Sequence, residues 1–153
     1  MRIAIGSDEA THLTTMLIED LATRGHEVIA CGALRPGAGA DWPDSSSTVA
    51  RLVASGEVDQ GIVCCWTGTG ASIAANKVRG ARAALCGDAE TARGARRWND
   101  ANVLALSLRA TSEAIAREIL DTWLATAPDA DTWNQAQLRK LDALDNSAQP
   151  EGG

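Results

Sequence analysis

Short apolar segments alternate with longer amphipathic segments along most of the chain. The apolar segments carry β-branched side chains and little charge, which is typical of strands buried in a parallel sheet. They lie at residues 2–6, 27–31, 60–64, 81–85 and 103–106. Between them, apolar residues at helical spacing predict helices at about 11–24, 46–55, the alanine-rich run after Gly70, 89–98, 111–125 and 129–144.

Polar residues and glycines mark the expected ends of these helices. Asp44–Ser46 and Thr111 are residue types that cap helix N-termini, and Gly25 is suited to end the first helix. Pro128 separates the last two helices, because proline interrupts a helix but is tolerated at its start. We expect one domain over residues 1–145, followed by a disordered tail at 146–153.

Alternating strands and helices predict an α/β fold with three layers. Five parallel strands would form a Rossmann-like sheet with helices on both faces. Ligands of such sheets bind at the carboxyl ends of the strands. On this rule we place the following segments on one rim: Asp8, Asp41–Asp44, Cys65–Ser72, Asp88 and Trp98–Asn102.

Charge and composition narrow the classes of function. The net charge is −6 and no basic cluster is present, which argues against binding to nucleic acid or to an anionic membrane. No apolar stretch is long enough to span a membrane. The chain enters its first strand without a signal peptide, and its four cysteines then indicate reduced thiols in the cytoplasm. No His/Cys spacing resembles a metal site, and we expect neither metal nor cofactor.

The segment from Gly61 to Lys77 carries the strongest chemical signal. A buried strand leads to Cys65, then to a turn containing Thr67, Gly68 and Gly70, and then to a helix. In this geometry, backbone N–H groups converge on a negative group, and a thiolate beside them would be stabilised. The alternative is that Cys65 is a small buried hydrophobic residue and that the glycines only turn the chain.

Several motifs together resemble the ribose-5-phosphate isomerase B and galactose-6-phosphate isomerase family. The resemblance covers residues 1–125, and its most specific part is Cys-x-Thr-Gly-x-Gly followed by Ser-Ile-Ala-Ala-Asn-Lys. The other matching segments are Ile3–Asp8, Gly25–Ile29, Asp41–Asp44 and Asn99–Ala105. The family interconverts aldose and ketose phosphates through an enediolate, without a metal.

The resemblance implies a role for each matching residue. Cys65 would be the base that moves a proton between C1 and C2, and Asp8 would hold substrate oxygens near the reacting carbons. Asn99 would reach the site from the other subunit of a homodimer with shared active sites, and the last helix would pack on that subunit. The developing oxyanion and the rest of the substrate would be held by Thr67, Gly68, Thr69, Gly70 and Ser72.

The chain departs from the family at the other end of the substrate. Glu9 stands where the family has a histidine, and Trp98 stands where it has the histidine that opens the sugar ring. Two arginines that hold the phosphate correspond to Trp133 and Gln137. We still count all four among the substrate-binding residues. The Glu9 carboxylate would repel a phosphate group, whereas it could accept hydrogen bonds from sugar hydroxyls.

Three interpretations fit these departures. Another cation could hold the phosphate, the candidates being Arg35, Arg96, Arg97, Arg139 and Lys140. Alternatively, the substrate is an uncharged or modified sugar that stacks on Trp98, Trp133, Trp42 or Trp66. The third interpretation is a catalytically silent relative that senses a sugar, although the retained Cys65 favours an enzyme.

Replacement of the ring-opening histidine has a mechanistic consequence. Either Glu9 or Asp100 performs the acid–base step on the ring oxygen, or the substrate is already open-chain. A tetrose whose terminal oxygen is blocked cannot close a furanose ring, and would need no such group.

Overall fold

Five parallel strands form one sheet in a computed structural model that describes residues 1–147. The strands follow the order β2-β1-β3-β5-β4 across the sheet, so β3 lies at its centre. Their bounds are β1 Arg2–Ser7, β2 Glu27–Gly32, β3 Gln60–Cys65, β4 Ala83–Leu85 and β5 Val103–Ser107. The strands lie at the positions that the apolar segments predicted, with β4 shortened to its last three residues.

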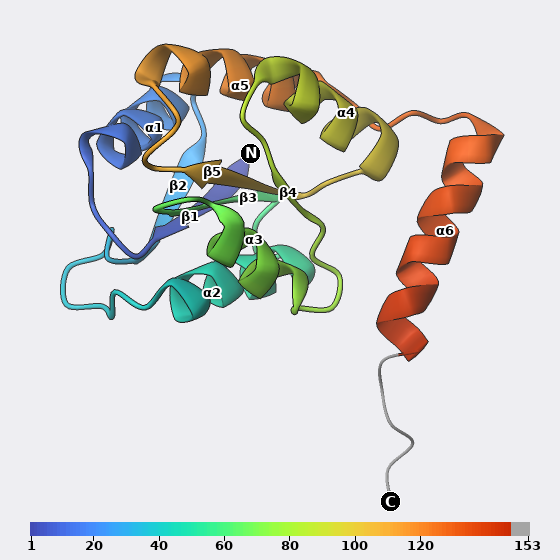
Figure 1. The fold of residues 1–153 in the computed structure, drawn as a ribbon, viewed down its shortest axis with the longest axis horizontal. Helices are drawn as coiled ribbons and strands as arrows, with labels where there is room; N and C mark the ends of the chain where they lie inside the picture. Colours follow the sequence, from blue (N-terminus) through green and yellow to red (C-terminus); the bar gives the residue numbers. More distant parts are fainter. Residues whose placement is uncertain (148–153) are drawn as a thin grey trace, which may run out of the picture.

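Helices cover both faces of the sheet, which confirms the predicted three-layer α/β fold (Figure 1). One face carries α1 (His12–Thr23), α4 (Ala89–Asn99) and α5 (Glu113–Ala125), and the other carries α2 (Trp42–Ala54) and α3 (Thr69–Asn76). The described part of the chain contains no helix with the length and apolar character that crossing a bilayer requires.

The sheet separates two apolar cores, and the two neighbouring cysteines of β3 lie in different ones. Cys64 is buried with residues of α1, α4 and α5, whereas Cys65 is buried with residues of α2 and α3. The alternation of side chains along a strand predicts this opposition. Trp123 is fully buried, and its indole N–H donates a hydrogen bond of 2.8 Å to the Gln60 side chain.

Two helix starts differ from the prediction. The helix expected from Ser46 begins at Trp42, because Pro43 fits the first turn, where its missing N–H costs nothing. Asp44–Ser46 therefore lie inside α2 and do not cap it. The helix expected to be capped by Thr111 is capped by Ser112 instead, whose hydroxyl accepts from the Ile115 N–H at 3.2 Å.

The last helix, α6 (Thr132–Ser147), stands apart from the three layers (Figure 1). It begins three residues after the predicted start, since the Asp131 carboxylate accepts from the N–H groups of Trp133 and Asn134 at 2.8 and 3.0 Å. It also continues through Ser147, beyond the start of the predicted tail. The rest of that tail lies outside the described residues.

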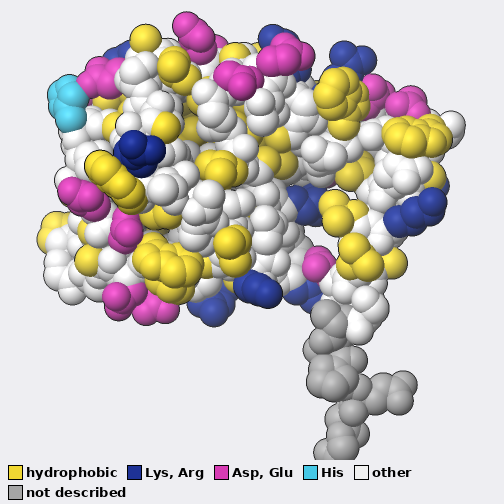
Figure 2. Space-filling model, in the orientation of Figure 1, with side chains coloured by type: hydrophobic (Ala, Val, Ile, Leu, Met, Phe, Trp, Pro, Cys, Tyr) yellow, Lys and Arg dark blue, Asp and Glu magenta, His cyan; other side chains and the backbone are white. Residues whose placement is uncertain are grey.

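Polar contacts fix α6 beside the sheet. The Arg97 guanidinium lies 3.3 Å from the Asp129 carboxylate just before the helix, and Asp145 accepts from the Gly80 N–H at 2.8 Å near its end. Hydrophobic side chains nevertheless remain exposed along α6 (Figure 2), with Trp133 71 % and Leu144 64 % exposed.

The prediction that Trp98–Asn102 share the rim with Cys65 is wrong within one chain. These residues connect the end of α4 to the start of β5 and therefore lie at the amino ends of the strands. Because the helices run antiparallel to the strands, loops alternate between the two ends of the sheet, and only those that follow a strand reach the carboxyl rim.

Candidate active site

A pocket of about 260 Å³ opens at the carboxyl ends of β1 and β3. It is lined by Asp8, Trp42, Cys65, Trp66, Thr67, Thr69 and Gly70. Five of these seven residues are among the predicted site residues, and these five come from two separate segments of the chain. The structure therefore brings together the part of the predicted site that surrounds the thiol.

The Cys65 sulfur lies at the junction between β3 and α3. It accepts a hydrogen bond from the Ala71 N–H at 3.4 Å. Cys65 as a whole is 6 % exposed and lines the pocket. Cys64 has no such access, and burial in the opposite core raises the pKa of its thiol to about 12. Of these two neighbouring thiols, only Cys65 meets the pocket.

Gly68 makes the tight turn between β3 and α3 possible. Its φ of 76° lies in the left-handed region, and a Cβ at this position would lie 2.6 Å from Leu85 Cδ1 and 2.9 Å from the Leu106 carbonyl carbon. Its N–H donates to the Cys65 carbonyl at 3.2 Å. The N–H groups of Thr69 and Gly70 remain for a ligand, because a helix start supplies no carbonyl for them.

Hydroxyl groups complete the donor side of the pocket. The Thr67 and Thr69 Oγ1 atoms lie 2.7 Å apart and share a hydrogen bond. Ser72 contributes through its backbone, since its N–H donates to the Gly68 carbonyl at 3.0 Å and closes the first turn of α3. The pocket thus combines a thiol, two hydroxyls and free backbone donors.

Asp8 brings a carboxylate to the same pocket. Its Oδ1 atom is buried without a hydrogen-bond partner among the described residues, which leaves it available to a ligand hydroxyl. Glu9 is exposed and does not line the pocket. Ser7 orients this loop, because its hydroxyl donates to the Glu9 carbonyl at 2.8 Å.

Arg109 is a cation of the rim that the sequence-based prediction did not include. It lines a second pocket, of about 390 Å³, and Thr67 lines both pockets. The backbone N–H of Arg109 donates to the Trp66 carbonyl at 3.1 Å. This bond connects the loop after β5 to the loop after β3. The place of Arg109 two residues after the end of β5 is the sequence signal that could have identified it.

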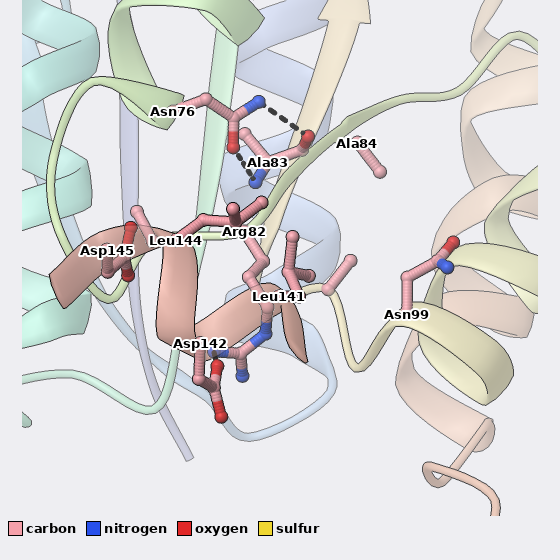
Figure 3. A pocket seen from close by; sticks show the side chains of 11 residues that line it. Asn76, Arg82, Ala83, Ala84, Asn99, Leu141, Asp142, Leu144 and Asp145 are labelled. Atoms are coloured by element: carbon pink, nitrogen blue, oxygen red, sulfur yellow. Dashed lines mark hydrogen bonds and ion pairs between the residues drawn. The ribbon is translucent and has the colours of Figure 1, made fainter. Parts of the chain in front are cut away.

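The remaining predicted site residues lie elsewhere in this chain. Asn99 lines a pocket of about 440 Å³ between the end of α4, β4 and α6, where Leu141, Asp142 and Leu144 face it (Figure 3). Trp98 is 54 % exposed on α4, and Trp133 and Gln137 lie on α6. None of these side chains lines the pocket around Cys65.

The cations proposed from the sequence to hold a phosphate also lie away from Cys65. Arg96 is buried and lies 3.5 Å from Asp100, and Arg97 pairs with Asp129. Arg35 lines a separate pocket beside β2, and Arg139 and Lys140 are exposed on α6. The Asp100 carboxylate forms an ion pair with the Arg82 guanidinium at 3.0 Å. This contact leaves Asp100 poorly placed to act as an acid or base on a substrate near Cys65.

Comparisons with known proteins show which family the whole chain resembles. A family model described as Ribose/Galactose Isomerase matches residues 3–141. The chain is 43 % identical over 124 residues to ribose-5-phosphate isomerase B of Escherichia coli, covering 80 % of this chain and 83 % of that protein. It is 38 % identical over 125 residues to D-erythrulose-4-phosphate isomerase of Pectobacterium atrosepticum, covering 81 % and 82 %.

A solved structure extends the similarity to nearly the whole fold. Ribose-5-phosphate isomerase B of Clostridium thermocellum superimposes with a TM-score of 0.89 at 41 % identity, and the match covers 97 % of this chain and 100 % of that chain.

Proposed function

The chain belongs to the ribose/galactose isomerase family, and we propose that it interconverts a short aldose phosphate and its ketose phosphate with Cys65 as the base. The observation that carries this proposal is the Cys65 sulfur, which faces a pocket and accepts the Ala71 N–H at 3.4 Å. The Ala71 N–H belongs to the first turn of α3, so the start of this helix holds the sulfur in position beside the pocket.

The proton transfer follows from the groups around the pocket. The Cys65 thiolate takes the proton from C2 of the aldose, the C–H electrons form the C1–C2 double bond, and the carbonyl electrons move onto O1. A proton passes from O2 to O1, and return of the first proton to C1 gives the ketose. The free Asp8 oxygen suits the role of holding these two oxygens.

Charge that develops on the substrate oxygen meets the donor side of the pocket. The Thr67 hydroxyl and the N–H groups of Thr69 and Gly70 are fixed by the turn at Gly68, so they need no reorganisation when the oxyanion forms. Each such donor contributes roughly 3 kcal/mol to transition-state stabilisation.

Arg109 supports a phosphorylated substrate. Its pocket adjoins the thiol pocket at Thr67, so a short chain could extend from Cys65 to the guanidinium. Arg109 would bind the phosphate in place of the two family arginines, whose positions are Trp133 and Gln137 in this chain. The alternative of an uncharged sugar loses the support of Glu9, which is exposed outside the pocket.

A four-carbon, open-chain sugar phosphate fits best. Trp98 has no group for acid–base work on a ring oxygen, and Asp100 is held by Arg82. One relative is named as an isomerase of D-erythrulose 4-phosphate, a substrate that cannot form a furanose. We therefore expect better turnover of tetrose phosphates than of pentose phosphates.

A second copy of the chain would supply the remaining groups. Exposed apolar side chains lie on neighbouring elements of the β4 edge: Leu85, Trp98, Trp133, Leu141 and Leu144. Patches of this kind mark contact surfaces. In a symmetric dimer joined there, Asn99 and the residues of α6 would approach the partner's pocket, as the resemblance implies.

Proton exchange in heavy water tests this function. D-erythrose 4-phosphate, D-ribose 5-phosphate and their unphosphorylated sugars are incubated with the protein, and NMR follows deuterium at C1 and C2. We expect exchange with the phosphates, fastest for the tetrose, and its loss in Cys65→Ala. Tight binding without exchange by the wild type would instead favour the silent, sugar-sensing relative.

A further inference from the structure

Two tryptophans line the pocket around Cys65. Trp42 begins α2 and Trp66 directly follows β3, so the two indoles come from segments far apart in the sequence. They are 42 % and 61 % exposed, although an indole is among the largest apolar groups that folding can bury. The described fold therefore leaves both without a complete packing partner.

Trp42 is held in place by the absence of a side chain at Gly70. A Cβ on Gly70 would lie 3.1 to 3.3 Å from three atoms of the indole, so the ring rests directly on the first turn of α3. Trp42, Thr69 and Gly70 line the same pocket, so a ligand held by the Thr69 and Gly70 N–H groups would lie beside this ring.

Trp66 is fixed through its backbone while its indole extends into solvent. The Trp66 carbonyl accepts from the Ser107 hydroxyl at 2.9 Å and from the Arg109 N–H at 3.1 Å. These bonds anchor the residue at Thr67, where the thiol pocket meets the Arg109 pocket. Trp66 itself lines the thiol pocket next to Thr67, the residue that the two pockets share.

We infer that Trp42 and Trp66 form an aromatic clamp that binds the C–H face of the substrate's carbon chain and thereby selects its length. This inference rests on the proposed function in taking this pocket as the sugar site. A carbon chain that carries its hydroxyls on one side presents C–H groups on the other, and these pack on indole faces. The clamp favours a thin, open chain over a bulkier furanose ring.

Indole N–H signals in NMR test the clamp without requiring turnover. Labelled Cys65→Ala protein gives one indole signal per tryptophan, and Trp42→Phe and Trp66→Phe assign two of them. We expect D-erythrose 4-phosphate to shift the signals of Trp42 and Trp66, whereas that of the buried Trp123 stays in place. Inorganic phosphate alone, which has no carbon chain, should leave the Trp42 signal unmoved.

Affinity provides the quantitative measurement. In the Cys65→Ala background, Trp66→Ala should weaken tetrose phosphate binding about tenfold, and Trp66→Phe should restore most of it. In otherwise wild-type protein, Trp66→Ala should raise KM while kcat changes little.

The outcomes separate this inference from the proposed isomerisation. Shifted Trp42 and Trp66 signals without wild-type proton exchange would uphold the clamp and reject the catalytic proposal. Proton exchange with both signals unmoved, or with unchanged affinity in Trp66→Ala, would overturn the clamp. Signals that shift with protein concentration but not with sugar would assign the two indoles to contact between copies, and would also overturn it.

Discussion

The Ala71 N–H points at the Cys65 sulfur from 3.4 Å, so the first turn of α3 meets the end of β3 at the thiol. This bond uses a donor that has no carbonyl partner inside the helix. Sulfur and donor are six residues apart, and the left-handed turn at Gly68 brings them together. The local sequence thus places the thiol at the start of α3 without help from distant segments.

Replacing each of the neighbouring cysteines by alanine should separate catalysis from packing. We expect Cys65→Ala to lower kcat for a sugar phosphate by at least a thousandfold, because this change removes the proposed base. Cys64→Ala is the matched control. It removes one buried sulfur, should cost about 1 kcal/mol of unfolding free energy, and should keep kcat near the wild-type value.

Iodoacetamide at pH 8 gives an independent check of the same assignment. Burial raises the pKa values of Cys64 and Cys86 to about 12, so neither thiol ionises appreciably at that pH. Mass spectrometry should find Cys65 alkylated ahead of both, with activity lost in parallel. Alkylation of Cys64 first would contradict the assignment.

The turn at Gly68 should tolerate no side chain. In Gly68→Ala the new Cβ meets Leu85 and the Leu106 backbone, in addition to the left-handed φ of 76°. Gly37 shares that φ but has open space around its Cβ position, so Gly37→Ala measures backbone strain alone. We expect about 1 kcal/mol of destabilisation for Gly37→Ala and about 3 kcal/mol for Gly68→Ala in chemical denaturation. Equal losses would show that the steric contact is unimportant.

Arg109 should act on the phosphate and not on the sugar. Arg109→Gln removes the charge but keeps a hydrogen-bonding side chain of similar reach. We expect KM for a tetrose phosphate to rise about 10-fold to 100-fold, with kcat less affected. Arg35→Gln, in the separate pocket beside β2, should leave KM unchanged. A phosphate-dependent KM that responds to Arg35 would reassign the anion site.

The thiol site could be predicted from the sequence because its parts are close in the chain. β3, the turn at Gly68 and α3 lie within one short segment, and the residue types dictate the order strand, turn, helix. Arg109 could not be found in the same way. It becomes a neighbour of Thr67 only because β5 lies beside β3 in the sheet. The order of strands in a sheet cannot be predicted from a local sequence pattern.

The placement of Trp98 and Asn99 failed for a different reason. Motif matching identified them as site residues, but the rule about strand ends was applied to a loop that precedes a strand. Similarly, α6 was foreseen as a helix, whereas its separation from the three layers depends on contacts such as Asp145 with Gly80. Long-range polar contacts of this kind leave no periodic signal in the sequence.

Acid should remove the contribution of Asp88 to stability. Its carboxylate caps α4 by accepting from the Thr91 N–H at 2.7 Å, and these hydrogen bonds lower the pKa of Asp88 below its ordinary value. The ionised form is therefore favoured by folding. Its contribution is full above the unfolded-state pKa, which is near 3.9, and is lost as the pH falls through the folded-state pKa.

Two variants isolate this effect in thermal unfolding. Asp88→Ala should lower Tm at pH 7, and its difference from the wild type should shrink as the pH falls below the unfolded-state pKa and through the lower folded-state pKa, where the wild-type carboxylate becomes protonated. Asp88→Asn keeps a capping oxygen without a titrating group, so it should stay close to the wild type at pH 7. A difference between Asp88→Ala and the wild type that grows in acid would reverse the sign argued here.

Subunit mixing should reveal whether active sites are shared between copies. If Cys65 of one subunit works with Asn99 of the other, Cys65→Ala and Asn99→Ala homodimers each lack one group in both sites. A mixed dimer collects both substitutions in one site and leaves the other intact. Unfolding and refolding an equal mixture should then restore about a quarter of wild-type activity, since half of the dimers are mixed and half of their sites are complete.

The control for this experiment is refolding each variant alone, which should restore nothing. Trp123, buried within a single chain, reports whether refolding succeeded through its fluorescence. A mixture that stays inactive although both variants refold would place Cys65 and Asn99 in separate functions. In that case the exposed apolar surface at the end of α4 and on α6 would need an explanation other than a shared active site. Asn99 would then no longer be proposed to contact the substrate.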